Sequence, residues 1–291
     1  MNKHAYLILA HKDDLTFRTL LKLIDNQKHD IYIHMDKKLV NYDIYTVENL
    51  LTHSNVFHID RTDVRWGGYS QINAELLLLE KAIINREYSF YHLLSGEDLL
   101  LKPSNEIYDF FEMNIGKNFV RFESKNFKHQ NRVKYYHFFQ DLIGRDNNVI
   151  LKILNKTSLI LQKYLKVNRN KDIHFQKGTN WFSINRKLAQ YVIEQKDFII
   201  NTFKYTYCAD EMFLQTLVHN SFFKNTLYHL EYDNSLKALM RFIDWERGTP
   251  YVFKKENFNE LVNSPYLFAR KFDARLDNHI IIKLYDYLEN N

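Results

Sequence analysis

The chain has 291 residues, a formal net charge of +5, 45% hydrophobic residues and 26% charged residues. This mixture is typical of globular domains, and the scarcity of Gly (7) and Pro (3) excludes collagen-like and low-complexity disordered proteins. The single cysteine, Cys208, excludes a disulfide framework within the chain and argues against a zinc site built on cysteines.

The first apolar stretch of the chain covers residues 6–10. It is far shorter than the ~20 apolar residues that cross a membrane, and no signal-peptide cleavage pattern accompanies it. We therefore expect a cytoplasmic protein.

Strand and helix patterns alternate in the first half of the chain. Short continuous apolar runs, typical of strands buried on both faces, cover residues 5–10, 31–34, 56–59 and 90–94. Between them, apolar residues recur at helical spacing at Phe17, Leu20, Leu21 and Ile24, and again in a long helix for which Ser70 is the expected N-cap. This alternation predicts an α/β fold with a mainly parallel sheet.

Polar clusters lie at or near the ends of the predicted strands, at residues 11–14, 36–38, 65–68 and 95–98. In mainly parallel sheets, ligands bind beyond the carboxyl ends of the strands. The clusters therefore predict a small-molecule site at this edge of the sheet.

The middle of the chain is strongly basic. Residues 115–177 carry 14 Lys or Arg and four acidic residues, a net charge of +10, which leaves −5 for the rest. Such a block favours an anionic partner (phosphate, a membrane surface or nucleic acid) or forms a solvated surface. Residues 132–167 look mostly helical, and residues 148–167 form a basic amphipathic helix that either lies on a membrane or, as we expect, packs its apolar face on its own domain.

The second half begins with a predicted strand at residues 179–184 and a helix from Arg186, and it ends with an amphipathic tail at residues 279–288. A further helix is predicted from about Asp210, which places Asp210 and Glu211 in its first turn. The helix dipole favours ionised carboxylates there, and an ionised carboxylate can take a proton from an attacking hydroxyl. Alternatively, Asp210 caps the helix and Glu211 only complements its dipole.

Common catalytic and cofactor motifs are missing from the sequence. It contains no dinucleotide-binding Gly-x-Gly-x-x-Gly, P-loop, His-Glu-x-x-His or Gly-x-Ser-x-Gly motif, and no Asp-x-Asp, the tripeptide that commonly binds a metal under a sugar-nucleotide diphosphate. The 13 His lack metal-ligand spacing. We expect neither a metal nor another cofactor.

Cations lie within two aromatic runs near the end of the chain, Arg270 and Lys271 in one and Arg247 in the other. Cations held by aromatic packing can offset the charge of a leaving diphosphate where a metal would otherwise do so. The alternative is ordinary ion pairing, for instance of Lys271 with Asp273.

An ordered series of short motifs, from about Ala5 to Asp273, resembles glycosyltransferase family 14, the core-2/I-branching β-1,6-N-acetylglucosaminyltransferases and peptide O-xylosyltransferases. The motifs are Ala5-Tyr6-Leu7-Ile8 with Ala10-His11-Lys12, Ile33-His34-Met35-Asp36-Lys37, Arg65-Trp66-Gly67-Gly68, Leu94-Ser95-Gly96-Glu97-Asp98, Gly178-Thr179-Asn180-Trp181-Phe182, Ala209-Asp210-Glu211, Phe242-Ile243-Asp244-Trp245 and Leu267-Phe268-Ala269-Arg270-Lys271-Phe272-Asp273.

The resemblance implies a GT-A-like fold, inversion at the anomeric carbon and independence from metal, with Glu211 as the catalytic base. It implies that Lys271 binds the diphosphate, with Arg247 or Arg270 in place of an arginine that relatives carry near Tyr251. The other residues implied to bind the nucleotide and donor sugar are His11, Asp36, Arg65, Trp66, Ser95, Gly96, Glu97 and Asp98. Those implied to bind the acceptor are Glu123, Trp181 and Asp210.

No repeat or linker divides the chain, so we expect one domain with a helical acceptor-side insertion. Residues 1–113 would form the nucleotide-sugar half, 114–278 the acceptor and catalytic half, and 279–291 a tail. The predicted function is transfer of a sugar from a UDP-sugar to a glycan, glycoprotein or lipid-linked acceptor, forming a β-linkage in surface polysaccharide or glycoprotein assembly. Membrane contact through residues 148–167 is a further hypothesis.

Two other classes remain as alternatives. One is a non-catalytic carbohydrate- or nucleotide-binding protein, and the other is a basic nucleic-acid-binding protein. Because the clusters at the strand ends lie outside the basic block, we expect no nucleic acid partner.

Overall fold

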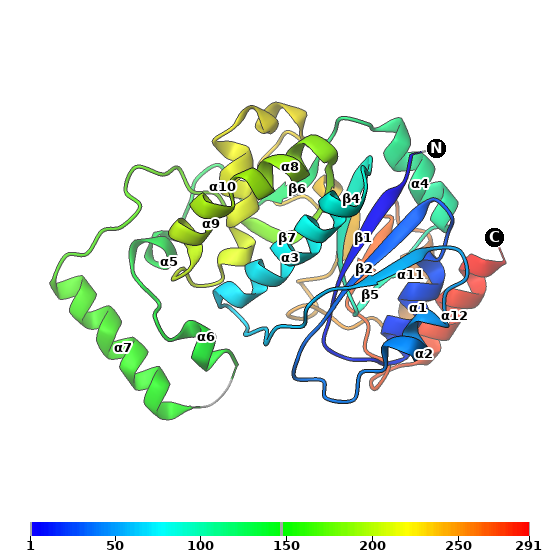
Figure 1. The fold of residues 1–291 in the computed structure, drawn as a ribbon, viewed down its shortest axis with the longest axis horizontal. Coiled ribbons are helices and arrows are strands. Elements are labelled where there is room, and N and C mark those ends of the chain that lie inside the picture. Colours follow the sequence, from blue (N-terminus) through cyan, green and yellow to red (C-terminus); the bar gives the residue numbers. More distant parts are fainter. Residues whose placement is uncertain (1, 146–147, 291) are drawn as a thin grey trace.

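The computed structural model describes residues 2–145 and 148–290. Its main sheet has six strands in the order β3-β2-β1-β4-β7-β6 (Figure 1). The strands are β1 (His4–Ala10), β2 (His29–Met35), β3 (Asn55–His58), β4 (Phe90–Ser95), β6 (Phe119–Phe122) and β7 (Gly178–Asn185). Strands β1 to β4 are parallel, whereas β7 runs antiparallel to both β4 and β6. The predicted α/β fold with a mixed, mainly parallel sheet flanked by helices is confirmed.

A second sheet brings the last third of the chain to the end of β4. It contains the three-residue strands β5 (Asp98–Leu100), β8 (Arg241–Ile243) and β9 (Phe268–Arg270), in the order β5-β9-β8. Asp98 is paired with Arg270 in its register. Through this pairing, residues that are 172 positions apart in the sequence become neighbours.

The helices cover both faces of the main sheet, except for α7 (Val149–Tyr164), which extends away from it. They are α1 (Leu15–Ile24), α2 (Ile44–Glu48), α3 (Tyr69–Asn85), α4 (Ser104–Met113), α5 (Gln130–Lys134), α6 (Gln140–Ile143), α7 (Val149–Tyr164), α8 (Arg186–Glu194), α9 (Lys196–Phe203), α10 (Phe213–His219), α11 (Phe258–Val262) and α12 (His279–Glu289). Short 3-10 turns occur at Ala209–Glu211, Phe222–Thr226, Leu236–Ala238 and Lys255–Asn257. None of the described helices is long and apolar enough to cross a bilayer.

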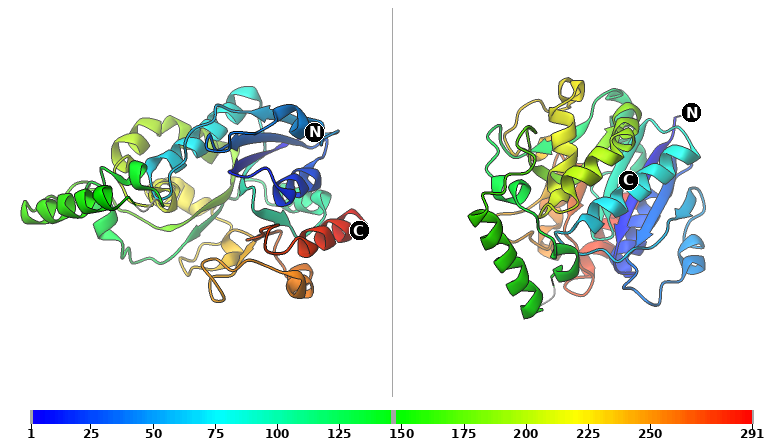
Figure 2. Two further views of the ribbon diagram at one scale, coloured as in Figure 1. Left: turned by 90° about the horizontal axis from the view of Figure 1, so that it is seen from below. Right: turned by 60° about the vertical axis from the view of Figure 1, so that its left-hand side comes forward.

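Alternate residues of the strands face two different hydrophobic cores, as the two-residue period of a strand requires. Leu7 and Leu93 belong to the core under α3 and α8, whereas Ile8 and Leu94 belong to the core under α1 and α12. The left view of Figure 2 shows the sheet between these two helical layers. The predicted tail is therefore a packed helix, α12, whose apolar side is buried.

The predicted N-cap of the long helix is wrong. Helix α3 begins at Tyr69 after Gly68, and Ser70 lies inside its first turn. The cap comes instead from α6, where the Asp141 carboxylate accepts hydrogen bonds from the backbone N–H groups of Tyr69 (3.2 Å) and Ser70 (3.1 Å). A Cβ at Gly68 would lie 2.0 Å from Asp141 Oδ1 and 3.1 Å from the Asp141 Cα, so a larger residue there would displace the carboxylate that caps α3.

The expected packing of residues 148–167 on their own domain is also wrong. The region 132–167 contains the separate helices α5, α6 and α7, and α7 extends away from the body of the molecule (Figure 1). Gln162 is the only residue of α7 that is buried in the described structure. Periodicity correctly predicts an amphipathic helix but does not say which face turns toward the protein.

Candidate active site

A cleft of about 1280 Å³ lies at the carboxyl ends of the parallel strands, where the sequence predicts a ligand site. Residues that follow β1, β2 and β4 form part of its wall, and residues near β7, β8 and β9 form the rest. It brings together most of the predicted site residues: His11, Asp36, Arg65, Trp66, Ser95, Glu97, Glu123, Trp181, Asp210, Glu211, Arg247, Arg270 and Lys271.

Two predicted donor-binding residues, Gly96 and Asp98, lie behind the wall of the cleft. A Cβ at Gly96 would come within 3.2 Å of the Ala10 Cβ, so this residue allows β4 and β1 to end in close contact. Asp98 is fully buried and accepts hydrogen bonds from the backbone N–H (3.1 Å) and hydroxyl (2.8 Å) of Ser95. Neither Gly96 nor Asp98 is among the residues that line the cleft in the described structure.

A group of cations surrounds Glu97 on one wall of the cleft. The Glu97 carboxylate contacts Lys12 Nζ (2.8 Å), Lys271 Nζ (3.1 Å) and Arg270 Nη2 (3.3 Å). Burial alone would raise the pKa of Glu97, but the charge of Arg270 and the hydrogen bond from Lys12 outweigh it and lower that pKa. Arg270 and Lys12 also pair with Asp98 and Asp273, which pair in turn with Arg241 and Arg275. The cluster therefore has five cations and three carboxylates, a formal charge of +2 that suits an anionic ligand.

The alternative pairing of Lys271 with Asp273 is not what the structure has. Lys271 pairs with Glu97, whereas Asp273 contacts Lys12 (3.2 Å) and Arg275 (2.8 Å). Lys12, which contacts both Glu97 and Asp273, links the ion pair of Lys271 to that of Asp273.

The two candidate arginines occupy different surroundings within the cleft. Arg247 pairs with Asp244 and with Glu260 (2.6 Å), and its guanidinium lies 4.6 Å from the centre of the Tyr251 ring. Arg270 pairs with Asp98 (2.8 Å) and lies beside Lys271 in the chain. Each arginine lies against an aromatic ring, Arg247 against Tyr251 and Arg270 against Trp181. Of the two, only Arg270 belongs with Lys271 to the cluster around Glu97.

Trp181 contacts arginines instead of offering a free ring to a sugar. Its side chain is only 7% exposed, and the guanidinium groups of Arg270 and Arg241 lie 4.6 and 5.1 Å from its ring centre. Stacking of this kind fixes the plane of a guanidinium. Trp181 therefore positions Arg270 within the cleft.

Arg241 is a buried cation whose role is not visible in the sequence. It is 1% exposed, donates to Asp98 Oδ2 (3.0 Å) and to the backbone carbonyl of Leu93 (2.8 Å), and burial lowers its pKa to about 10. Asp98 thus lies between two arginines, Arg241 behind it and Arg270 toward the cleft.

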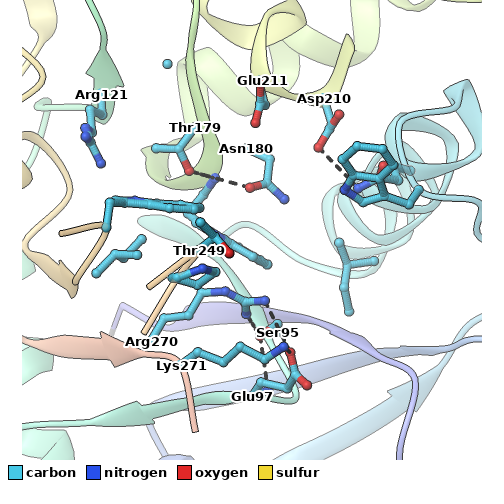
Figure 3. Close-up of a pocket in the computed structure, with 18 of the residues that line it drawn as sticks. Ser95, Glu97, Arg121, Thr179, Asn180, Asp210, Glu211, Thr249, Arg270 and Lys271 are labelled. Atoms are coloured by element: carbon cyan, nitrogen blue, oxygen red, sulfur yellow. Dashed lines mark hydrogen bonds and ion pairs between the residues drawn. The ribbon is translucent and has the colours of Figure 1, made fainter. Parts of the chain in front are cut away.

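Glu211 lies across the cleft from Arg270 and Lys271 (Figure 3). It belongs to the 3-10 turn Ala209–Glu211 and not to the first turn of α10, because Met212 departs from helical geometry (φ −133°) and separates the two. Both acids therefore share the 3-10 turn that precedes α10, their predicted placement in the first turn of the α-helix itself is wrong, and Asp210 is not the cap of α10. Cys208, with φ 47°, turns the chain into this 3-10 segment and donates its N–H to the carbonyl of Gly67 (2.9 Å).

Two cations contact the Glu211 carboxylate, which is partly exposed to the cleft. Arg132 Nη1 donates to Oε2 (2.8 Å), and Lys177 Nζ lies 3.5 Å from the same oxygen. Lys177 also pairs with Glu123 (3.1 Å), which in turn contacts His129 (3.0 Å). Burial opposes ionisation of Glu123, but the hydrogen bond and charge of Lys177 lower its pKa.

The sequence did not single out Arg132 and Lys177 as site residues. Both belong to the basic block at residues 115–177, as does Arg121. Arg121 and Lys177 line the cleft. The charge count indicated an anionic partner or a solvated surface but did not say which cations meet Glu211. Within residues 2–145 and 148–290, no three His, Cys, Asp or Glu side chains cluster as a metal site would require.

Asp210 differs sharply from its neighbour Glu211. It is 7% exposed and accepts a hydrogen bond from Gln71 Nε2 (3.2 Å) on α3. Burial, followed by the negative charge of Glu211, raises the pKa of Asp210 from 3.8 to about 7. Both carboxyl groups line the cleft, and Glu211, with 34% of its side chain exposed, is the more accessible of the two.

Replacing Asp210 with Asn is expected to remove a pH-dependent loss of stability. Because the folded-state pKa is raised, stabilisation from the protonated group is complete below the unfolded-state pKa of 3.8 and is lost as the pH rises through about 7. One pKa unit corresponds to about 1.4 kcal/mol. In the wild type, the free energy of unfolding should therefore fall by up to a few kcal/mol between mildly acidic and mildly alkaline buffer. In Asp210→Asn this fall should be absent. Urea denaturation of both proteins checks this, with Asp197→Asn on the surface as a control, and equal pH dependence would contradict it.

A family model described as "Core-2/I-Branching enzyme" matches residues 4–262. The human N-acetyllactosaminide β-1,6-N-acetylglucosaminyl-transferase is 26% identical over 92% of this chain and 68% of its own length. Xylosyltransferase 2 of Rattus norvegicus is 23% identical over 95% of this chain, which spans only about a third (32%) of that relative. Among solved structures, S. aureus TarS 1–349 matches 46% of this chain and 40% of its own at 13% identity with a TM-score of 0.28.

Proposed function

The chain belongs to the Core-2/I-Branching enzyme family, and from this membership and the cleft we propose that it is an inverting glycosyltransferase that uses a UDP-sugar without a metal. The acceptor would be a hydroxyl group of a glycan or glycoconjugate. The observation that carries the proposal is the position of Glu211 across the cleft from Arg270 and Lys271 (Figure 3).

Glu211 would act as the general base. Among the described residues, Arg132 and Lys177 both contact Oε2, which leaves Oε1 to accept the proton of an acceptor hydroxyl. The hydroxyl oxygen then bonds to the anomeric carbon as the bond to UDP breaks on the opposite face, which inverts the configuration. A single carboxylate base suffices because the diphosphate is a good leaving group that needs no protonation.

The cations around Glu97 would stabilise the leaving UDP. The electron pair of the broken bond goes to the diphosphate, whose negative charge rises by one as the bond breaks. Lys271 and Arg270 are already held in place by Glu97, Asp98 and Trp181, so they need little reorganisation to meet that charge. This arrangement supports a reaction in which protein cations serve the role of a divalent metal.

The remaining predicted residues divide between the two ends of the cleft in this proposal. His11, Asp36, Arg65 and Trp66 follow the ends of the parallel strands, the usual position of a nucleotide in such sheets. Glu123 lies at the end of β6, next to Lys177 and on the side of Glu211, where an acceptor hydroxyl must approach. The Glu123 carboxylate would accept hydrogen bonds from hydroxyl groups of the acceptor sugar.

A thermal-shift and hydrolysis panel of UDP-sugars tests the proposed function. UDP at 100 times its Kd stabilises the folded state by about 2.7 kcal/mol, so the melting temperature should rise by several degrees in EDTA, and one UDP-sugar should be hydrolysed slowly. Lys271→Gln should reduce the shift, whereas Lys187→Gln, an exposed residue on α8, should leave it unchanged.

Two results of this panel would contradict the proposal in different ways. A rise in melting temperature only when Mn²⁺ is added would overturn the metal-independent reaction. No response to any UDP compound would overturn the nucleotide donor itself.

A further inference from the structure

Helix α7 turns its apolar side away from the protein. Eight large apolar side chains on α7 and the residue after it are 46–82% exposed, a third of the 24 exposed large hydrophobic residues in the described structure. They are Val149, Ile150, Ile153, Leu154, Ile160, Leu161, Tyr164 and Leu165. At 3.6 residues per turn, these positions form one continuous broad face of the helix.

The side of α7 that meets the protein carries the hydrogen-bonded polar residues of the helix, together with the partly buried Leu151 and Leu159. Gln162 accepts a hydrogen bond from the backbone N–H of Tyr136 (2.7 Å) and donates to its carbonyl (2.9 Å), and it also donates to Ser158 Oγ (3.1 Å). Asn155 lies on the same side, one turn before Ser158, and is partly buried. A helix that packs on a globular core normally does the opposite and buries its apolar side.

Lysines line one edge of the apolar face. Lys152, Lys156 and Lys163 recur at helical spacing beside it, and Lys166 follows the end of the helix. Residues 148–171 contain six Lys or Arg and no acidic residue. The face is therefore bordered by positive charge.

We propose that α7 docks the protein on an anionic lipid bilayer, with the apolar face buried at the level of the headgroups and acyl chains and the lysines against lipid phosphates. A bilayer offers both an apolar layer and negative charge in one plane, which is what this helix is built to meet. A second copy of the chain fits less well because it would bring the same row of lysines and no acidic residue from its own α7.

Docking through α7 would hold the cleft near the membrane. Arg145, which lines the cleft and lies 5.5 Å from the centre of the Trp66 ring, is three residues before Asn148, the N-cap of α7. In addition, Asp141 of the neighbouring helix α6 caps α3 at the rim of the same cleft. This position suits an acceptor glycan carried on a lipid, a consequence that rests on the proposed transfer reaction, whereas the docking itself does not.

Vesicle flotation of the full chain tests the docking. The wild type should float with phosphatidylcholine vesicles that contain phosphatidylserine at low salt, bind pure phosphatidylcholine vesicles much more weakly, and lose binding as salt rises. Each lysine near an anionic surface contributes roughly fivefold to binding, so Lys156→Glu with Lys163→Glu should weaken it more than tenfold. Ile153→Ser with Leu161→Ser should weaken it by at least tenfold through the loss of buried apolar area.

Controls separate docking from folding and from catalysis. Ile84→Ser, which alters an apolar residue of α3 that is 74% exposed, should float like the wild type. All α7 variants should keep the wild-type melting temperature and its response to UDP, and the flotation contains no sugar nucleotide, so its outcome does not depend on the transferase reaction. Absence of wild-type binding at low salt, or equal binding to neutral and anionic vesicles, would overturn the proposal, as would a dimer that Ile153→Ser with Leu161→Ser converts to a monomer.

Discussion

Replacing Glu211 with Gln is expected to lower the rate of sugar transfer by about 10²–10⁴-fold, the usual contribution of a general base. Gln keeps the size of the side chain and one oxygen that accepts from Arg132, but it cannot take the proton of the acceptor hydroxyl. UDP should still bind with nearly wild-type affinity, because the cations proposed to hold the diphosphate lie on the opposite wall of the cleft. The measurement is kcat with the donor identified by the UDP-sugar panel, together with the UDP-induced thermal shift.

Two further variants show whether that loss belongs to the carboxylate of Glu211. Glu194→Gln, at the exposed end of α8, should have wild-type activity. Glu123→Gln removes the other carboxylate bound to Lys177 and should raise the KM for the acceptor more than it lowers kcat. Wild-type turnover in Glu211→Gln would show that another group takes the proton.

The parallel half of the fold was predictable from the sequence because each of its strands is a continuous apolar run. The runs at residues 5–10, 31–34, 56–59 and 90–94 correspond closely to β1, β2, β3 and β4. The second sheet was not predicted, because strands of three residues are too short to show a period. It nevertheless brings Arg270 and Lys271 to the end of β4, so the cationic wall of the cleft depends on contacts that local patterns do not encode.

The candidate site shows the same limit at the level of single side chains. Motif order identified Glu211, Arg270 and Lys271, and all three line the cleft. Their partners were not identified: Arg132 lies 79 positions before Glu211, and Asp98 lies 172 positions before Arg270. Whether a given arginine is buried, paired or exposed follows from tertiary packing, which the residues next to it in the sequence do not reveal.

The largest expected effect on stability is that of Arg241→Met. Arg241 and Asp98 are 1% and 0% exposed and form a buried ion pair at 3.0 Å. Met fills a similar volume but leaves the Asp98 carboxylate buried with fewer donors, and breaking a buried pair in this way typically costs 3–5 kcal/mol. Because Ser95 and Arg270 still donate to Asp98, we expect a loss of about 3 kcal/mol, measured as the free energy of unfolding in urea. Arg186→Met, which breaks the surface pair with Glu87, should cost no more than about 1 kcal/mol.

A second substitution separates the lost ion pair from lost packing around Arg241. If the cost comes from the unpaired charge of Asp98, adding Asp98→Asn to Arg241→Met should recover part of the stability, because a neutral amide is cheaper to bury than a carboxylate. The rise in melting temperature that UDP causes should not recover, since Asp98→Asn also removes the charge that holds Arg270 against the cleft wall. A double variant that regains stability but binds UDP more weakly would show that the buried pair serves the diphosphate site through Arg270. No gain in stability over Arg241→Met would mean that packing against Trp181 and Phe268, at 5.1 and 5.6 Å from the guanidinium, is what Arg241 chiefly supplies.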